Sequence, residues 1–256
     1  MTYIDLTMPV DWEWMPDEVF PTATQLVVGP PRDALKGFTL GNETATCLLL
    51  PAQFAEFRKT VRIDGIDTAS LVLRPTRVVD VPCEPGGALT ADSLSAALGR
   101  SEVATGEAIL LRTGWGDSFA ERRGSASYML ESPYLSEEGA ELLGEEMRRL
   151  QTDLVLLDTA LVSRPDKHLM SEWATLSPRG APWPSETARG YLRGYTEERV
   201  REDWAADYAL ARHGVMVAKK LVNCGRLPAG RIFLIVAPLL LVRAIGATCR
   251  VVAVVD

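Results

Sequence analysis

The sequence predicts a single α/β domain, and two features of the 256-residue chain support this fold class. In the second half, continuous apolar runs, typical of strands covered on both faces, alternate with segments of helical periodicity. In the first half, short segments rich in β-branched residues are separated by turn signals, which favours antiparallel strands. Neither a linker nor an internal repeat divides the sequence, so we expect one domain over residues 1–256.

The first half contains mainly short predicted strands. They are expected at residues 3–6, 61–66, 70–73 and 77–81, with a loop over residues 11–31. A helix over residues 93–98 is expected to begin after Thr90, whose hydroxyl suits an N-cap, and to end near Gly99.

The second half alternates strands and helices. The apolar runs at 108–112 and 154–157 predict buried strands, and a helix begins at Ser136 with two glutamates in its first turn, where the helix dipole favours carboxylates. A second helix is predicted over 200–211. Further strands are predicted at 215–218, 233–236, 239–242 and 250–255.

Residues 163–204 differ from the rest because they combine four prolines and three tryptophans with little regular periodicity. A stretch of this kind is typically a functional lid or a packing arm. We expect a lid over a pocket, with an oligomer-contact arm as the alternative.

Composition excludes several classes of protein. With 47% hydrophobic and 24% charged residues the chain is an ordinary globular sequence, and the net charge of −7 argues against a nucleic-acid partner. The apolar run at 232–242 is about half the ~20 residues that a membrane span needs. No signal-peptide pattern opens the sequence, and the four cysteines form no CxxC pair, so a cytoplasmic protein with reduced thiols is expected. The two histidines, His168 and His213, are too few for a histidine-rich metal site.

Six segments occur in an order that resembles the cyclase family, which includes bacterial kynurenine formamidases, isatin hydrolases and cyclases of aromatic polyketide pathways. They are YIDLTMPV, ILLRTGW, SPYLSEEGAELL, LVLLDT, ARHGVMVAKKLVNCGRLP and APLLLVRAIGATCRVVAVV, and together they run from one end of the chain to the other. The resemblance implies one α/β domain with a barrel-like core of mixed and antiparallel sheet, helices packed outside, and a homo-oligomer.

The family's hydrolases carry the metal-binding motif HxGTHxDxPxH, which falls here on ETATCLLLPAQF, residues 43–54. Thr46, Pro51 and Phe54 keep the family pattern. The metal-binding and catalytic positions are replaced: they fall on Glu43, Cys47, Leu49, Gln53, Asp207 and Lys219.

The replaced positions make a poor metal site. Glu43, Cys47 and Asp207 carry donor atoms, but Leu49 has none, and the Lys219 ammonium repels a cation. We therefore expect neither a metal nor a cofactor.

The resemblance and the altered positions lead to one functional prediction. The chain is expected to be a metal-independent ring cyclase of aromatic polyketide biosynthesis, which closes a poly-β-ketone by intramolecular aldol condensation and dehydration. A carboxylate removes a proton next to a carbonyl and a lysine or amide stabilises the enolate. The catalytic candidates are Glu43, Asp207, Lys219 and Gln53. The substrate-binding candidates are Cys47, Leu49, Trp14, Arg112, Trp115 and Asp158.

Other interpretations remain open. The chain is alternatively a non-catalytic partner that binds a polyketide or a multi-enzyme complex, or a metal-dependent amide or lactam hydrolase with altered ligands. A carrier protein and other pathway enzymes are expected partners, and a membrane is not. Glu43 and Asp207 have an alternative interpretation as solvent-exposed carboxylates without a catalytic role, and Cys47 has one as a small residue of the core.

Two local contacts are also predicted. Because strand side chains alternate, only one of Lys219 and Lys220 is expected to point inward, and Lys219 is favoured. Arg112 and Thr113 are expected to bond the loop around Gln53.

Overall fold

The computed structural model describes residues 1–10, 43, 45–123, 127–164 and 196–255, and the backbone of residues 25–28 and 35–38. Trp14, most of the predicted loop at 11–31 and most of the predicted lid or arm at 163–204 lie outside the described residues.

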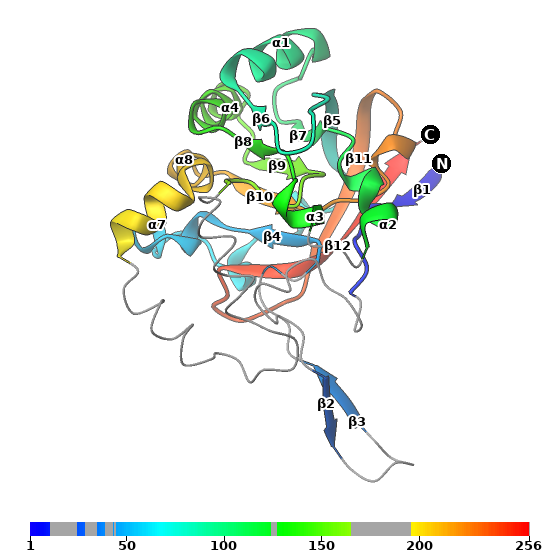
Figure 1. Ribbon diagram of the computed structural model, residues 1–256, viewed down its shortest axis with the longest axis vertical. Helices are drawn as coiled ribbons and strands as arrows, with labels where there is room; N and C mark the ends of the chain where they lie inside the picture. The colour runs from blue at the N-terminus through cyan, green and yellow to red at the C-terminus, as the bar shows by residue number, and fades with distance from the viewer. Residues whose placement is uncertain are drawn as a thin grey trace.

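In the part of the chain that the structure describes, seven strands close into a mixed barrel, which confirms the predicted α/β fold with a barrel-like core (Figure 1). The order around the barrel is β12-β11-β5-β7-β9-β10-β4, and β4 closes it by pairing with both β10 and β12. From β5 to β10 the strands are parallel, and the other pairings are antiparallel. β1 pairs antiparallel with the last residues of β12, beyond the part of β12 that pairs with β4. The bounds are Thr2–Asp5 (β1), Cys47–Leu49 (β4), Arg74–Asp80 (β5), Ala108–Arg112 (β7), Leu154–Leu157 (β9), Met216–Lys219 (β10), Gly230–Pro238 (β11) and Gly246–Val255 (β12).

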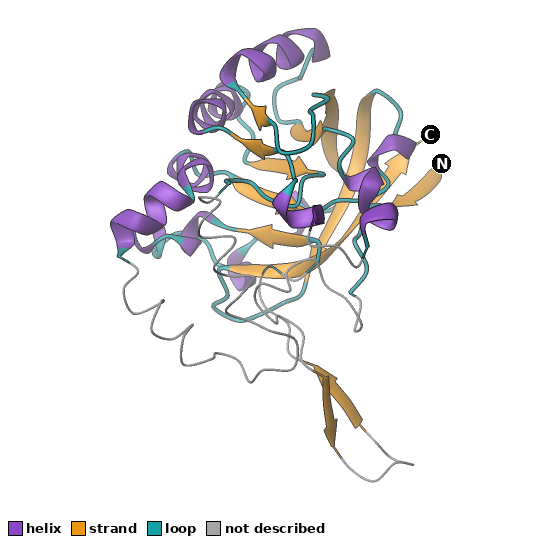
Figure 2. Ribbon diagram, in the orientation of Figure 1, coloured by secondary structure: helices purple, strands orange, loops and turns teal. Residues whose placement is uncertain are grey.

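The longer helices lie together on one side of the barrel (Figure 2). The predicted caps are present: the Thr90 side chain accepts a hydrogen bond from Ser93 N–H, and that of Ser136 accepts one from Gly139 N–H. The helices are α1 (Ala91–Ser101), α2 (Phe119–Arg122), α3 (Ser127–Leu130), α4 (Glu137–Arg149), α7 (Glu197–Asp203) and α8 (Ala205–Arg212). Outside the barrel, β2 (Gln25–Val28) pairs with β3 (Leu35–Phe38), and β6 (Ala88–Leu89) pairs with β8 (Tyr134–Leu135).

Two apolar cores share the sheet because strand side chains alternate between its faces. Leu154 and Leu156 of β9 point into the barrel interior, whereas Val155 and Leu157 pack against the helices. This explains why the run LVLL is apolar at every position and was predicted as a strand covered on both faces. The outward face of the barrel, under α8, is where the candidate site lies.

Three predicted elements are wrong. Residues 61–66 and 70–73 are not strands but contain two short 3-10 turns, and Asp67 explains one of them, because its side chain accepts the Ala69 N–H and favours a turn. Residues 239–242 form an exposed connection instead of a strand, with Leu240 76% and Val242 74% exposed. The ladder ends at Pro238, which has no N–H to donate. The 3-10 helices are η1 (Pro51–Gln53), η2 (Ala55–Phe57), η3 (Ile63–Gly65), η4 (Thr68–Ser70), η5 (Gly116–Ser118) and η6 (Cys224–Arg226).

The helix predicted over 200–211 is interrupted. It consists of α7 and α8, which meet at Trp204, whose φ of −115° and ψ of 44° are not helical. The first half is also less antiparallel than predicted, because β5 is parallel to β7. No helix among the described residues is both long and apolar enough to cross a membrane.

Candidate active site

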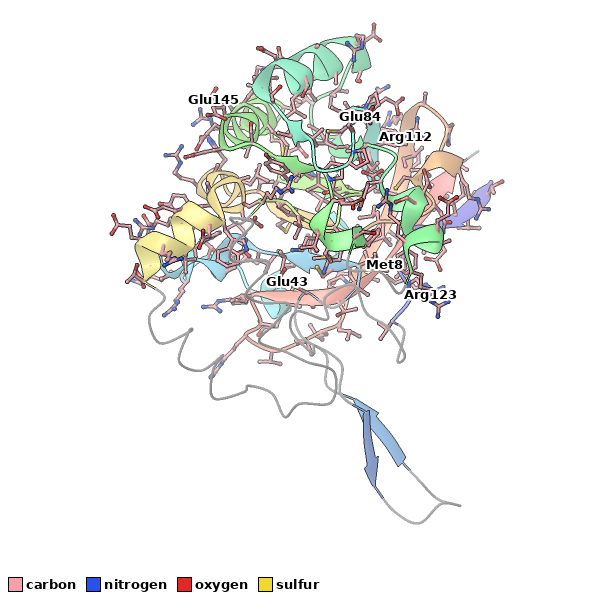
Figure 3. The ribbon with its side chains drawn as sticks, in the orientation of Figure 1. Met8, Glu43, Glu84, Arg112, Arg123 and Glu145 are labelled. Carbon is pink, nitrogen blue, oxygen red and sulfur yellow. The ribbon has the colours of Figure 1, made fainter. Side chains whose placement is uncertain are left out.

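An ion pair between Glu43 and Lys219 stands at the centre of the candidate site. Lys219 ends β10 directly opposite Cys47 of β4, and its Nζ lies 2.5 Å from Glu43 Oε2. The lysine side chain is only 7% exposed, whereas that of Glu43 is 47% exposed. Glu43 lies beside β4 (Figure 3), so the pair joins a buried cation to an anion that solvent still reaches.

Both neighbouring lysines point to this place, so the prediction that only one of them does is wrong. The Lys220 side chain is 1% exposed, and its Nζ donates a 2.7 Å hydrogen bond to the carbonyl oxygen of Glu43. Strand alternation ends at Lys219, because Lys220 has a left-handed backbone with φ of 62°. This turn brings the second ammonium back to the same loop.

Asp207 approaches from α8, and it is buried rather than solvated, with 4% exposure. Its Oδ2 accepts hydrogen bonds from the N–H and the hydroxyl of Ser163 at 3.0 and 2.6 Å. In return its own N–H donates to Ser163 Oγ at 3.0 Å. Ala206, Ala209 and Leu210 bury α8 against the sheet, and so fix the position of Asp207.

The charges of this group shift the pKa values of the two carboxyls in opposite directions. Burial raises the pKa of Glu43, but the ammonium groups of Lys219 and Lys220 outweigh burial and hold the pKa below its usual value. Burial raises the pKa of Asp207, and neither Lys219 nor the Ser163 hydrogen bonds fully offset it. Burial lowers the pKa of Lys219, yet the charges of Glu43, Cys47 and Asp207 raise it above its ordinary value overall. When the pKa values of two neighbouring carboxyls are shifted apart, the one with the lower pKa suits a base and the one with the higher pKa suits an acid.

Cys47 and Leu49 form an apolar floor next to the pair. They are 0% and 2% exposed and point to the same face of β4, with Cys47 opposite Lys219 and Leu49 opposite Val217. The Cys47 sulfur lies close enough to Lys219 to affect its pKa. The structure therefore brings Glu43, Cys47, Leu49, Asp207 and Lys219 into one group.

Gln53 lies further along the same segment, at the end of η1, which packs against α8. Its side chain is partly buried, and its backbone N–H donates to Leu50 carbonyl oxygen at 3.0 Å. The adjacent Phe54 ring meets Tyr208 edge-on, with centroids 5.3 Å apart. No contact described in this part of the chain joins Gln53 to Glu43 or Lys219.

Arg112 and Thr113 do not bond the loop around Gln53, so that prediction is wrong. The Arg112 guanidinium pairs with both oxygens of Asp80, at 2.6 and 3.0 Å, and donates to the carbonyl oxygens of Cys224 and Leu227. Arg112 thus ties β5 to η6, because its guanidinium fork finds an acidic partner on the neighbouring strand.

Asp158 has a structural setting of its own. It is fully buried at the end of β9, and its carboxylate accepts the N–H and hydroxyl of Thr113 and the N–H of Gly114. Burial raises the pKa of Asp158 despite these bonds. Trp115 follows in the same turn, 5% exposed and stacked on Tyr128 with centroids 5.8 Å apart. These contacts hold the turn after β7 and include neither Glu43 nor Lys219.

Ser163 and Lys220 belong to this site but were not predicted as site residues. Thr46 was predicted only as a position that keeps the family pattern, and it too has contacts here. The Thr46 hydroxyl accepts the N–H of Met8 and donates to the carbonyl oxygen of Lys220, both at 2.7 Å. The adjacent pair Lys219-Lys220 was the available signal, since two lysines at the end of an apolar strand are unusual. Ser163 carries no signal of its own, because only the fold brings it to Asp207.

The residues of this site do not suit a divalent cation. Among residues 1–10, 43, 45–123, 127–164 and 196–255, no three His, Cys, Asp or Glu side chains are placed to hold a metal ion. Leu49 offers no donor atom, and the Lys219 ammonium itself forms the ion pair with Glu43. A metal ion bound to Glu43 would have to displace that ammonium against charge repulsion.

Comparisons with known proteins agree with this fold. The family model described as "Putative cyclase" matches residues 4–160, so the chain belongs to the cyclase family, as the resemblance implied. No curated protein matches.

Solved structures share the architecture at low identity. An isatin hydrolase bound to the product analogue thioisatinate has a TM-score of 0.67 at 19% identity, over 99% of this chain and 92% of its own. Isatin hydrolase A from Ralstonia solanacearum has a TM-score of 0.65 at 19% identity, with coverages of 100% and 92%. A potential metal-dependent hydrolase with cyclase activity has a TM-score of 0.61 at 18% identity, and 98% of each chain is covered. The family match thus indicates an enzyme of the cyclase family, and the solved neighbours, at 18–19% identity, show that the fold is shared.

Proposed function

We propose that this chain is a metal-independent ring cyclase that closes a poly-β-ketone into an aromatic ring by intramolecular aldol condensation and dehydration. The observation that carries the proposal is the Glu43–Lys219 pair beside the buried Asp207. A base, a cation and a proton donor are the groups that this reaction requires.

Each group has a role in the proposed sequence of steps. The Glu43 carboxylate takes a proton from a methylene between two carbonyls, and the Lys219 ammonium stabilises the enolate oxygen. The enolate carbon attacks the carbonyl carbon five bonds along the chain, which closes a six-membered ring with one new carbon–carbon bond, and the resulting alkoxide takes a proton from Asp207. Asp207, now a carboxylate, takes a second proton from the ring methylene, and the protonated Glu43 gives its proton to the departing hydroxyl, which leaves as water. Both carboxyls return to their starting forms, and enolisation of the remaining ring carbonyls makes the ring aromatic with the loss of one water molecule.

The difference between the two carboxyls supports this assignment. Glu43, whose pKa is lowered, is ionised and accessible, whereas the raised pKa of the buried Asp207 favours the protonated form that a general acid needs. The methylene protons of a poly-β-ketone are already acidic, which reduces the need for a stronger base or a metal ion. Folding of the flexible substrate over the Cys47 and Leu49 floor would supply further rate through proximity.

The remaining features of the proposal concern binding. Gln53 is a proposed second donor to the enolate, and Trp14, Arg112, Trp115 and Asp158 remain proposed substrate-binding residues. A homo-oligomer and delivery of the substrate by a carrier protein also belong to the proposal.

A defined poly-β-ketone tests the reaction directly. Nonane-2,4,6,8-tetraone closes to 2,4-dihydroxy-6-methylacetophenone with loss of one water, and the product is followed by liquid chromatography against the spontaneous rate. The purified protein should accelerate this closure equally with and without EDTA. In the E43Q, K219M and D207N variants the catalysed rate of closure should fall at least tenfold.

Matched surface variants serve as controls. Asp92 and Lys59 are exposed, so D92N and K59M should keep the wild-type rate. If the protein binds the tetraone but neither it nor any variant changes the rate, the chain is a binding partner and the catalytic proposal is wrong. Complete inhibition by EDTA would instead favour a metal-dependent hydrolase or cyclase.

A further inference from the structure

Lys220 combines two unfavourable features at a single position. It is a non-glycine residue with φ of 62°, and it is among the largest fully buried side chains, with 1% exposure. A left-handed backbone strains a residue that has a Cβ, and burial of an ammonium removes its hydration. Strained residues of this kind persist where the surrounding structure holds them, and they concentrate at functional sites.

The backbone of Lys220 is fixed on both sides. Its N–H donates to Thr159 carbonyl oxygen at 3.0 Å, and its own carbonyl oxygen accepts the Thr46 hydroxyl at 2.7 Å. Thr46 is tied in turn to the N–H of Met8. Three segments distant in sequence therefore hold the point from which the lysine side chain extends.

The ammonium reaches the loop that carries the proposed base. Lys220 Nζ donates to the backbone carbonyl oxygen of Glu43 at 2.7 Å, while Lys219 Nζ meets the carboxylate of the same residue at 2.5 Å. The two lysines thus fix the main chain and the side chain of Glu43 separately. Since nearly half of the Glu43 side chain is exposed, packing alone does not immobilise it.

We propose that Lys220 is a positioning residue, which clamps the backbone of Glu43 so that its carboxylate faces Lys219 in the reactive orientation. This inference rests on the proposed function of Glu43 as the base, and it adds a residue that never touches the substrate. The left-handed turn is what allows two consecutive lysines to hold Glu43 from two directions, Lys219 at its carboxylate and Lys220 at its backbone carbonyl oxygen.

Three substitutions separate the clamp from the strain. K220M removes the charge and keeps the length, K220G removes the side chain and relieves the left-handed strain, and K220R keeps a cation. N223G is the matched control, because Asn223 is also left-handed, with φ of 59°, and bonds Asp5 rather than Glu43.

Two readouts apply to each variant. The first is kcat and KM for closure of nonane-2,4,6,8-tetraone. The second needs no activity: carboxyl NMR of protein labelled with ¹³C-glutamate, assigned with E43Q, follows the titration of Glu43. Among the residues that the structure describes, the charged groups that face this carboxyl are Lys219, Lys220 and Asp207.

In K220M and K220G, kcat should fall at least tenfold while KM changes less than threefold, and the Glu43 titration should move upward. K220R should keep most of the rate and the titration, and N223G should match wild type. The clamp is refuted if the folded K220G protein retains wild-type kcat and Glu43 titration. If no protein accelerates closure, the proposed function fails. The clamp then stands if K220M moves the Glu43 titration in the wild-type background but not in the K219M background, where a direct charge effect of Lys220 would persist, and it is refuted if the shift is the same in both.

Discussion

Lys219 Nζ lies 2.5 Å from Glu43 Oε2, although 176 positions separate the two residues in the chain. They meet because β4 pairs with β10 where the barrel closes, opposite Cys47. Because the Lys219 side chain is far less exposed than that of Glu43, loss of the partner should cost Lys219 more than it costs Glu43.

This inequality predicts different losses of stability for the two single substitutions. E43Q leaves a buried ammonium facing a neutral amide in place of its anionic partner and should lower the free energy of unfolding by about 1–3 kcal/mol. K219M leaves a carboxylate that water can solvate, so it should cost less. Urea unfolding of both variants at neutral pH checks the order, and an equal or reversed order would contradict it.

Asp207 makes the stability of the protein depend on pH. Burial raises its pKa above the value in the unfolded chain, so between these two values the unfolded chain has lost a proton that the folded protein keeps. The free energy of unfolding contributed by this group therefore falls as pH rises through that interval. D207N has no proton to lose, and its amide oxygen can still accept from Ser163.

The stability of D207N relative to wild type should accordingly increase from about pH 4 towards neutrality, by about 1.4 kcal/mol for each unit of the upward shift. Urea unfolding across this range measures the difference, with the exposed D92N variant as the control. Parallel stability curves for wild type and D207N would show that Asp207 titrates normally.

Ser163 should tune the proposed acid. Its hydroxyl donates to Asp207 at 2.6 Å and lowers the pKa of that carboxyl, so S163A should raise the pKa further. The alkaline limb of the rate profile for the tetraone should then move to higher pH, because a general acid must stay protonated. S163T should restore the wild-type profile.

A second buried serine supplies the control for this experiment. Ser132 Oγ donates to Pro133 carbonyl oxygen and accepts the N–H of Ala160, away from Asp207. S132A should lower stability without moving the profile. The same shift in S132A and S163A would mean that the profile reports a general loosening of the structure.

Two glycines should respond to alanine in opposite directions. At Gly116 an added Cβ would lie 2.1 Å from the carbonyl oxygen of Leu221 and 3.1 Å from Asp158 Cβ, so G116A should destabilise by at least about 2 kcal/mol. At Gly99, inside α1, the added Cβ meets nothing within 4 Å, and G99A should stabilise by about 0.5–1 kcal/mol. Thermal unfolding of both variants distinguishes them, and a G116A protein as stable as wild type would refute the close approach.

The elements predicted best from the sequence are those whose residue pattern only one structure explains. The strands at 108–112 and 154–157 match β7 and β9, because a strand packed on both faces must be apolar throughout. The cap at Ser136 was equally clear, since its hydroxyl satisfies an N–H of the first turn. The predicted strand at 239–242 failed because hydrophobicity does not reveal where a ladder loses its partner.

Part of the candidate site was predicted, but its internal contacts were not. Glu43, Cys47, Leu49, Asp207 and Lys219 do converge, but the resemblance placed them, not periodicity. The role of Lys220 could not be predicted, because alternation holds only within a strand and nothing local signals a left-handed lysine. Arg112 pairs with Asp80 instead of the loop around Gln53, and this partner could not be predicted because it depends on which strands are neighbours in the sheet.

The double pairing of β4 also has a consequence for the order of folding. This strand of three residues touches β10 and β12, and β12 is the last of the seven barrel strands in chain order. Its contacts are among the most distant in the sequence, and such contacts form late and slowly. Acquisition of the Glu43–Lys219 pair should therefore coincide with the final step of barrel closure, so that the nascent chain gains its reactive groups only after β12 has left the ribosome.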